Sequence, residues 1–130
     1  MIRVLIADDQ PRSRHSLQAL LTAMYWEHAS GGVDCDRLVE IVGEAADGRQ
    51  VLDQVHALQP EVVVMDLHLT VLDGLTVIRM IKQQWPDIRI VVLTMYATAR
   101  TAALAAGADA FLLKGCPTGE LLTAVRSGLG

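Results

Sequence analysis

The segment Val62-Val63-Val64-Met65-Asp66 constrains the fold most, because four apolar residues in a row end in a carboxylate. β-branched residues favour extended backbone, and the lack of polar alternation indicates a strand that is covered on both faces. Such strands belong to parallel sheets that lie between two layers of helices. Asp66 would then stand at the carboxyl end of a buried strand, where the sheet meets solvent.

Other apolar runs end in the same way. We predict strands at 2–7, 38–45, 62–66, 88–94 and 110–114, and polar residues close four of them: Asp8-Asp9, Asp66, Thr94 and Lys114. Amphipathic helices are predicted between and after the strands. They begin after Pro11, at the caps Asp47 and Asp73, near Thr98 and at Thr118. Alternating strands and helices imply right-handed crossovers and an α/β fold, a five-stranded parallel sheet with five helices on both faces.

Length and composition limit the alternatives. The chain of 130 residues fits a single domain at 1–130 and leaves no room for an output domain. A net charge of −4 gives no electrostatic footprint for direct nucleic-acid binding. No apolar stretch approaches the roughly 20 residues of a membrane span, and no signal-peptide layout is present, so we expect a cytoplasmic protein with no membrane contact. Cys35 and Cys116 are expected to be reduced thiols.

The strand ends predict one site. If the sheet has the flavodoxin-like, doubly wound order 2-1-3-4-5, Asp8, Asp9 and Asp66 converge, and their repulsion calls for a hard divalent cation such as Mg2+. Thr94 and Lys114 offer a hydroxyl and an ammonium suited to phosphoryl oxygens. Other phosphate motifs are absent from the sequence: the segment 43–50 lacks the Lys-Ser/Thr of a P-loop, and no GxGxxG exists.

One segment is too long for its place in this pattern. The helical periodicity fades near Tyr25, and residues 26–37 are predicted to form an inserted loop of about a dozen residues, where two to six are usual. The Tyr25-Trp26 pair either packs on the end of the helix or forms an exposed docking patch.

The sequence resembles a known family, the receiver domains of bacterial two-component response regulators. The resemblance is strongest to receivers of the LuxR/NarL kind. The matching motifs are ADDQP (7–11), GEAADG (43–48), VVMDL (63–67), LDGL (72–75), LTMY (93–96) and AGADAFLLK (106–114). The resemblance covers nearly the whole chain except residues 26–37.

The resemblance implies phosphotransfer. By analogy, Asp66 would accept a phosphoryl group from a sensor histidine kinase or from acetyl phosphate. Asp8 and Asp9 would hold Mg2+ together with Asp66 and the backbone carbonyl of His68. Lys114 and Thr94 would bind phosphoryl oxygens, and Phe111 would turn inward as the face of the fourth helix, fifth strand and fifth helix repacks. The family also implies dimerisation on phosphorylation and a DNA-binding output domain outside this chain.

The chain departs from the family pattern near the expected site. Thr70 replaces the usual proline after the phosphoacceptor, which predicts a more mobile loop, and Phe111 replaces a common tyrosine. Met95 is bulky and is predicted to slow the access of a small phosphoryl donor to the site. His68 and Tyr96 would flank the phosphoryl group and tune its hydrolysis, or would simply be solvated rim residues.

The resemblance predicts a signalling module that is not an enzyme in the usual sense, because it would catalyse only its own phosphorylation and dephosphorylation. One alternative is a non-switching pseudo-receiver that acts as a protein-interaction module. A flavodoxin-like cofactor enzyme is disfavoured, because no loop after a strand is rich in Ser, Thr or Gly.

Overall fold

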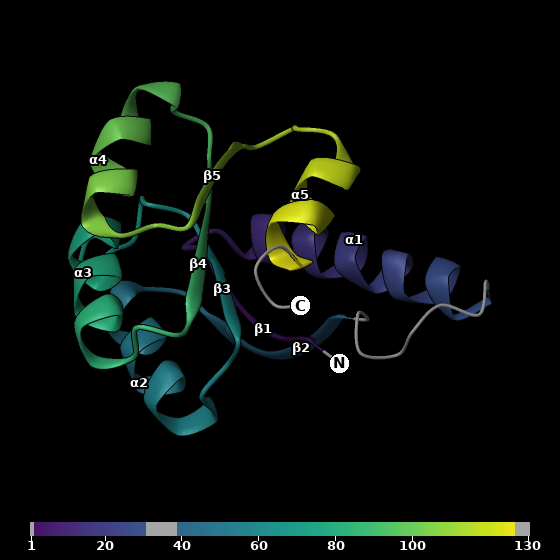
Figure 1. The fold of residues 1–130 in the computed structure, drawn as a ribbon, viewed down its shortest axis with the longest axis horizontal. Coiled ribbons are helices and arrows are strands. Elements are labelled where there is room, and N and C mark those ends of the chain that lie inside the picture. Colours follow the sequence, from purple (N-terminus) through teal and green to yellow (C-terminus); the bar gives the residue numbers. More distant parts are fainter. Residues whose placement is uncertain (1, 31–38, 127–130) are drawn as a thin grey trace.

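Five parallel strands form one sheet in the order β2-β1-β3-β4-β5 (Figure 1). The computed structural model describes residues 2–30 and 39–126. The strands are β1 (Ile2–Ala7), β2 (Val39–Ala45), β3 (Val62–Met65), β4 (Arg89–Thr94) and β5 (Ala110–Leu113). The predicted flavodoxin-like order and the alternation of strands with helices are confirmed.

Helices cover both faces of the sheet. They are α1 (Pro11–Ser30), α2 (Gly48–Leu58), α3 (Gly74–Gln84), α4 (Arg100–Ala106) and α5 (Thr118–Arg126). Figure 1 shows α2, α3 and α4 on one face and α1 and α5 on the other. The sheet therefore lies between two hydrophobic cores, one for each layer of helices.

The central strand β3 explains why its sequence lacks polar alternation. Val63 and Met65 pack into the core beneath α2, α3 and α4, whereas Val62 and Val64 pack into the core beneath α1 and α5. All four side chains are fully buried. Burial of a side chain of this size contributes about 1.5–3 kcal/mol, so a polar residue at any of these positions would be costly.

Helix α1 is longer than predicted. The loop predicted at 26–37 is wrong in its first part, because α1 continues through Trp26 to Ser30. The predicted helix ended near Tyr25 because its apolar stripe is lost there. Residues 25–30 contain no glycine or proline, however, so no residue forces the helix to stop before Gly31. The side chains of 23–30 and all of 31–38 lie outside the described residues. Both interpretations of the Tyr25-Trp26 pair therefore remain predictions.

The helix starts follow local chemistry. The carboxylates of Asp47 and Asp73 accept hydrogen bonds from the N–H groups of Gln50 and Thr76, at 2.8 and 3.0 Å, and so cap α2 and α3 as predicted. Helix α4 starts at Arg100 rather than near Thr98, after a single 3-10 turn, η2 (Ala97–Ala99). Neither η2 nor α4 has a capping side chain, which leaves this start weakly defined.

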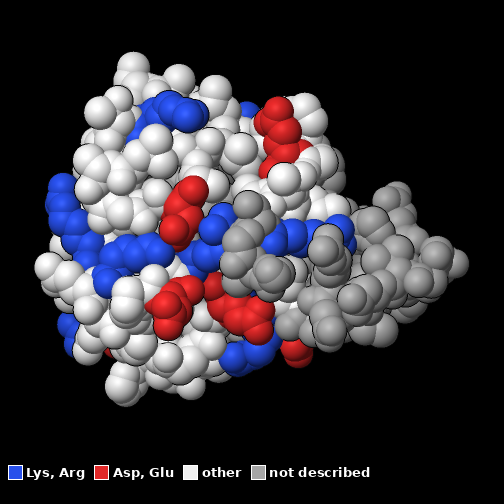
Figure 2. Space-filling view, viewed as in Figure 1, with Lys and Arg blue, Asp and Glu red and all other residues white. Residues whose placement is uncertain are grey.

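Three further observations concern the described residues. Among them, no helix is long and apolar enough to cross a membrane. Cys116 is a free thiol, as expected, whereas Cys35 lies outside the described part. Figure 2 shows a band of Lys and Arg side chains across the face seen there, with Asp and Glu on both sides of it. Both signs of charge are therefore interspersed on the described part of that face.

Candidate functional site

The register of the sheet brings the polar strand ends to one edge. Ala7 pairs with Met65, so Asp8 and Asp66 follow two adjacent strands at the same level. The N–H of Asp66 donates to the carbonyl oxygen of Ala7 at 3.0 Å, which continues the ladder to the edge. Thr94 pairs with Leu113, and the N–H of Lys114 donates to the Thr94 carbonyl oxygen at 2.7 Å. The predicted convergence of Asp8, Asp66, Thr94 and Lys114 is thus present.

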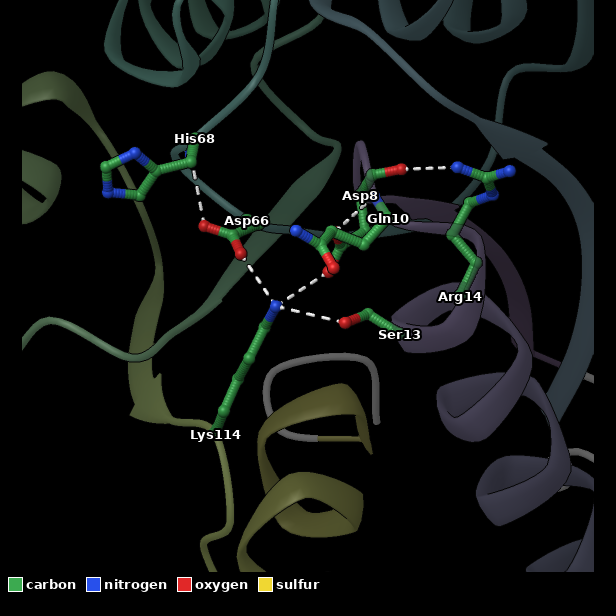
Figure 3. A network of polar contacts seen from close by, with 7 residues as sticks. All are labelled: Asp8, Gln10, Ser13, Arg14, Asp66, His68 and Lys114. Carbon is green, nitrogen blue, oxygen red and sulfur yellow. Dashed lines mark hydrogen bonds and ion pairs between the residues drawn. The ribbon is translucent and has the colours of Figure 1, made fainter.

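Lys114 joins the two buried carboxylates. Its Nζ atom lies 2.8 Å from Oδ2 of Asp8 and 2.8 Å from Oδ2 of Asp66, as Figure 3 shows. Asp8 and Asp66 are only 5% and 7% exposed. Burial alone would lower the pKa of Lys114, but the hydrogen bonds and charges of Asp66 and Asp8 outweigh it, so the pKa is raised. The ammonium therefore acts as the counter-ion of both carboxylates.

Backbone N–H groups hold the other carboxylate oxygens. Oδ1 of Asp8 accepts a hydrogen bond from the N–H of Gln10 at 2.9 Å, and Oδ1 of Asp66 accepts one from the N–H of His68 at 3.0 Å (Figure 3). Each carboxylate thus has one oxygen fixed by its own loop and one facing Lys114. This arrangement orients both groups before any ligand arrives.

Helix α1 supplies contacts that the sequence analysis missed. Nη1 of Arg14 donates to the backbone carbonyl oxygen of Asp8 at 2.7 Å, and its Nε lies 3.5 Å from a carboxylate oxygen of Glu44. The hydroxyl of Ser13 lies 3.4 Å from Nζ of Lys114. Ser13 and Arg14 lie in the first turn of the helix that follows the acidic pair Asp8-Asp9. The sequence could have indicated these contacts, because the first turn of that helix must face the end of the strand before it.

Asp9 occupies the outer edge of the site. It is exposed, and its pKa is raised by partial desolvation, by a hydrogen bond with Asp8 and by the charges of Asp8 and Asp66. The three carboxylates therefore interact electrostatically, as predicted. No three His, Cys, Asp or Glu side chains within 2–22 and 39–126 are already arranged to hold a metal ion. The oxygen-rich donor set nevertheless fits Mg2+, provided that the ammonium of Lys114 moves away from the carboxylates.

Thr94 is the most enclosed polar residue of the site. It is fully buried, and its Oγ1 atom finds no hydrogen-bond partner among the described residues. An unpaired buried hydroxyl costs about 1–3 kcal/mol, so a native structure that keeps one has a reason. A ligand oxygen at this strand edge would provide the missing partner.

The predicted rim residues surround the edge of the site. Met95 and Tyr96 are 72% and 54% exposed, and the Tyr96 ring contacts the His68 ring at a centroid distance of 4.6 Å. Figure 3 shows the His68 side chain pointing away from the Asp66 carboxylate. Phe111 is partly buried and packs against the core beneath α2, α3 and α4. Its buried ring fits a core residue, which leaves a switching role untested.

The loop after Asp66 is held at an unusual angle. Val71 has a φ of 69° and is 75% exposed, although left-handed backbone is unfavourable for a β-branched residue. The carbonyl oxygen of Thr70 accepts from the N–H groups of Gly48 and Leu72, at 3.0 and 2.8 Å. These two hydrogen bonds fix the turn in which Val71 is strained, directly after Thr70, the residue that replaces the expected proline.

Comparison with known proteins identifies the family of this fold. The sequence profile of the response regulator receiver domain matches residues 4–126. The chain belongs to the response regulator receiver family. Its Asp8, Asp66, Thr94 and Lys114 thus lie at the strand ends of a receiver, and the predicted resemblance is confirmed.

Individual relatives of this receiver are regulators of the predicted kind. Response regulator protein VraR of Staphylococcus aureus is 29% identical over 127 residues, which cover 96% of this chain and 55% of VraR. The chain thus spans about half the length of the curated relatives it matches.

Solved structures agree with this assignment. One is a two-component response regulator of the LuxR family from Aurantimonas sp. SI85-9A1, with a TM-score of 0.78, 27% identity and coverage of 95% of this chain and 81% of the other. Another is the signal receiver domain of the putative response regulator NarL from Mycobacterium tuberculosis, with a TM-score of 0.79, 28% identity and coverage of 95% and 92%. Receivers of this family are typically not conventional enzymes, and they typically use Mg2+.

Proposed function

We propose that this receiver takes a phosphoryl group onto Asp66 from a sensor histidine kinase or from a small donor such as acetyl phosphate, and that the modification changes its α4-β5-α5 face. The observation that carries the proposal is the position of Lys114. Its ammonium lies 2.8 Å from both Asp66 and Asp8, at a buried strand end where an added phosphoryl group would need a cation.

The residues of the site have complementary roles in this reaction. A carboxylate oxygen of Asp66 attacks phosphorus while the phosphorus–nitrogen bond of the phosphohistidine breaks and the imidazole leaves. The N–H of His68 holds the other oxygen of Asp66 and so orients the nucleophile. Lys114 keeps contact with one phosphoryl oxygen, and the unpaired hydroxyl of Thr94 donates to another.

The acidic residues are suited to hold Mg2+. Asp8, Asp9 and Asp66 would bind it with the backbone carbonyl oxygen of His68. The pKa of Asp9 is raised by desolvation, by its hydrogen bond with Asp8 and by the like charges of Asp8 and Asp66, and such a cation would relieve the repulsion between these charges. When bound, Mg2+ would neutralise charge on the transferring phosphoryl group. Lys114 must then release at least one carboxylate, because its ammonium now lies between two of them.

The response would spread from Thr94 to the neighbouring helices. A hydrogen bond from its hydroxyl to the phosphoryl group would draw the β4–α4 loop inward, and Phe111 on β5 would follow. Helix α4 suits this movement, because its buried residues in the structure are only two alanines, Ala103 and Ala106. His68, Met95 and Tyr96 would set access to the group and its rate of hydrolysis.

The larger assembly is inferred from the family. A sensor kinase partner follows from membership in it, and homologues of this chain carry DNA-binding domains. We propose a homodimer on phosphorylation and an output domain outside the present chain, in line with its match to about half of VraR. A cytoplasmic location would suit such a kinase partner.

Mass spectrometry tests the proposal directly. The protein is incubated with Mg2+ and acetyl phosphate, and we expect a mass increase of one phosphoryl group that Asp66→Asn abolishes. Asp53→Asn is the matched control, because Asp53 is an exposed carboxylate that pairs with Arg49 on the surface of α2. If neither acetyl phosphate nor a cognate kinase produced the increase, the non-switching interaction module would replace this proposal.

A further inference from the structure

A cavity of about 310 Å3 lies beside the acidic site, between α1 and α5. Lys114 and Asp8 form its inner wall, and Figure 3 shows Ser13 of α1 pointing toward Lys114 across this region. The remaining lining residues come from both helices and from β4 and the β5–α5 turn: Arg12, Ser16, Leu17, Leu20, Leu93, Gly115, Cys116 and Leu121. Its volume is at the lower end of the range for small-molecule sites.

The polar and apolar groups of the cavity are separated along α1. Arg12, Ser13 and Ser16 lie in its first two turns, whereas Leu17 and Leu20 lie further along the same helix face. With a rise of 1.5 Å per residue, Arg12 and Leu20 are about 12 Å apart along the helix axis. The cavity therefore suits an elongated molecule with a polar end and an apolar end.

The charges favour a negative polar end. Arg12 is exposed, and its guanidinium has no hydrogen bond or ion pair with any described residue. The inner end of the cavity does not attract an anion, because the Lys114 ammonium is already shared between the carboxylates of Asp8 and Asp66, at 2.8 Å from each. An anion would thus be attracted to the outer, α1 end, where two serine hydroxyls can also donate hydrogen bonds.

We propose that this cavity binds a short amphipathic carboxylate. Its head group contacts Arg12 and the hydroxyls of Ser13 and Ser16, and its aliphatic tail lies between the leucines of α1 and Leu121 of α5. Because the ligand contacts no atom of Asp66, binding does not require phosphorylation. Failure of the phosphotransfer proposal would therefore leave this one standing, and the reverse also holds.

Octanoate is the probe, and Cys116 reports on the site. The chain has two cysteines, so Cys35→Ser leaves the Cys116 thiol in the cavity wall as the single target for an alkylating reagent. Burial and the nearby Glu120 raise the pKa of this thiol, so the reaction is followed in mildly alkaline solution. We expect octanoate to slow alkylation, octylamine to have little effect, and 1-octanol to be weaker than octanoate.

Variants separate the head-group contact from general adhesion. Titration calorimetry should show octanoate binding weakened about fivefold by Arg12→Gln, as expected for an exposed ion pair of up to 1 kcal/mol. Arg12→Lys should retain most of the affinity. Arg79→Gln, on the exposed side of α3, should leave it unchanged. Absence of octanoate binding at about 10 mM would overturn the proposal. So would equal octanoate affinity of the Arg12→Gln variant and the unaltered protein, or equal affinity of the protein for 1-octanol and octanoate.

Discussion

Replacing Lys114 by methionine isolates the role of the internal counter-ion. The substitution keeps a long side chain but removes the ammonium that lies 2.8 Å from both Asp8 and Asp66. These carboxylates are 5% and 7% exposed, and each would keep its bond to a backbone N–H, at 2.9 and 3.0 Å. Two adjacent buried charges would then lack a cation.

The expected loss of stability is about 3 kcal/mol near pH 7. Removing one partner of a buried ion pair costs roughly 3–5 kcal/mol, and the lower end applies because the Lys114 side chain is itself 24% exposed. The loss should shrink when Mg2+ is added, because the metal would replace the missing cation.

Urea unfolding followed by circular dichroism measures these differences. Lys82→Met is the matched control: Lys82 lies 2.6 Å from Asp109, but only one carboxylate is involved and the pair lies away from the acidic edge. Its stability should not respond to Mg2+. A Lys114→Met variant that loses less than about 1 kcal/mol, or whose loss is the same with and without Mg2+, would refute this electrostatic account.

Alkaline solution tests the same ion pair in the unaltered protein. The pKa of Lys114 is raised in the folded state, so its contribution to stability is complete below the ordinary lysine pKa of about 10.4 and is lost as the pH rises through the higher folded value. Thr94→Val removes a buried hydroxyl that has no hydrogen-bond partner among the described residues, so it should raise stability by up to about 1 kcal/mol in urea unfolding. It should also abolish the phosphorylation-dependent change of the α4-β5-α5 face, as followed by NMR. A destabilised variant would contradict this. Val71→Gly should stabilise the protein by about 1 kcal/mol in the same assay, because glycine adopts a φ of 69° without strain, and a loss of stability would show that the turn is not strained. Met95→Ala should speed phosphorylation by acetyl phosphate, measured by mass spectrometry, because an exposed methionine lies next to Thr94; an unchanged rate would show that access is not limited there.

The sequence identified the strands and the residues at their ends because these depend on local patterns. A run such as Val62–Met65 can be buried on both faces in few other ways, and its register follows from its apolar residues. Parallel strands then bring their carboxyl ends to one edge. Asp8, Asp66, Thr94 and Lys114 could therefore be placed together before any coordinates were known.

Features that depend on tertiary contacts were not predictable in this way. The end of α1 was placed too early, because an apolar stripe reports burial whereas helical backbone can continue without it. The bond from Arg14 to the carbonyl oxygen of Asp8 depends on how α1 leaves β1. The positive φ of Val71 depends on two hydrogen bonds to Thr70, one of them from Gly48 at the start of α2.

The alanines of α4 also have a kinetic consequence. Ala103 and Ala106 are its buried residues in the structure, and neither carries a side chain that interlocks with the sheet. A helix that packs on the core through methyl groups can move without first withdrawing large side chains from a close-packed core. The energy barrier to its displacement is therefore low. We therefore expect α4 to change position within microseconds to milliseconds, and the lifetime of any response to be limited by chemistry at Asp66 rather than by movement of the helix.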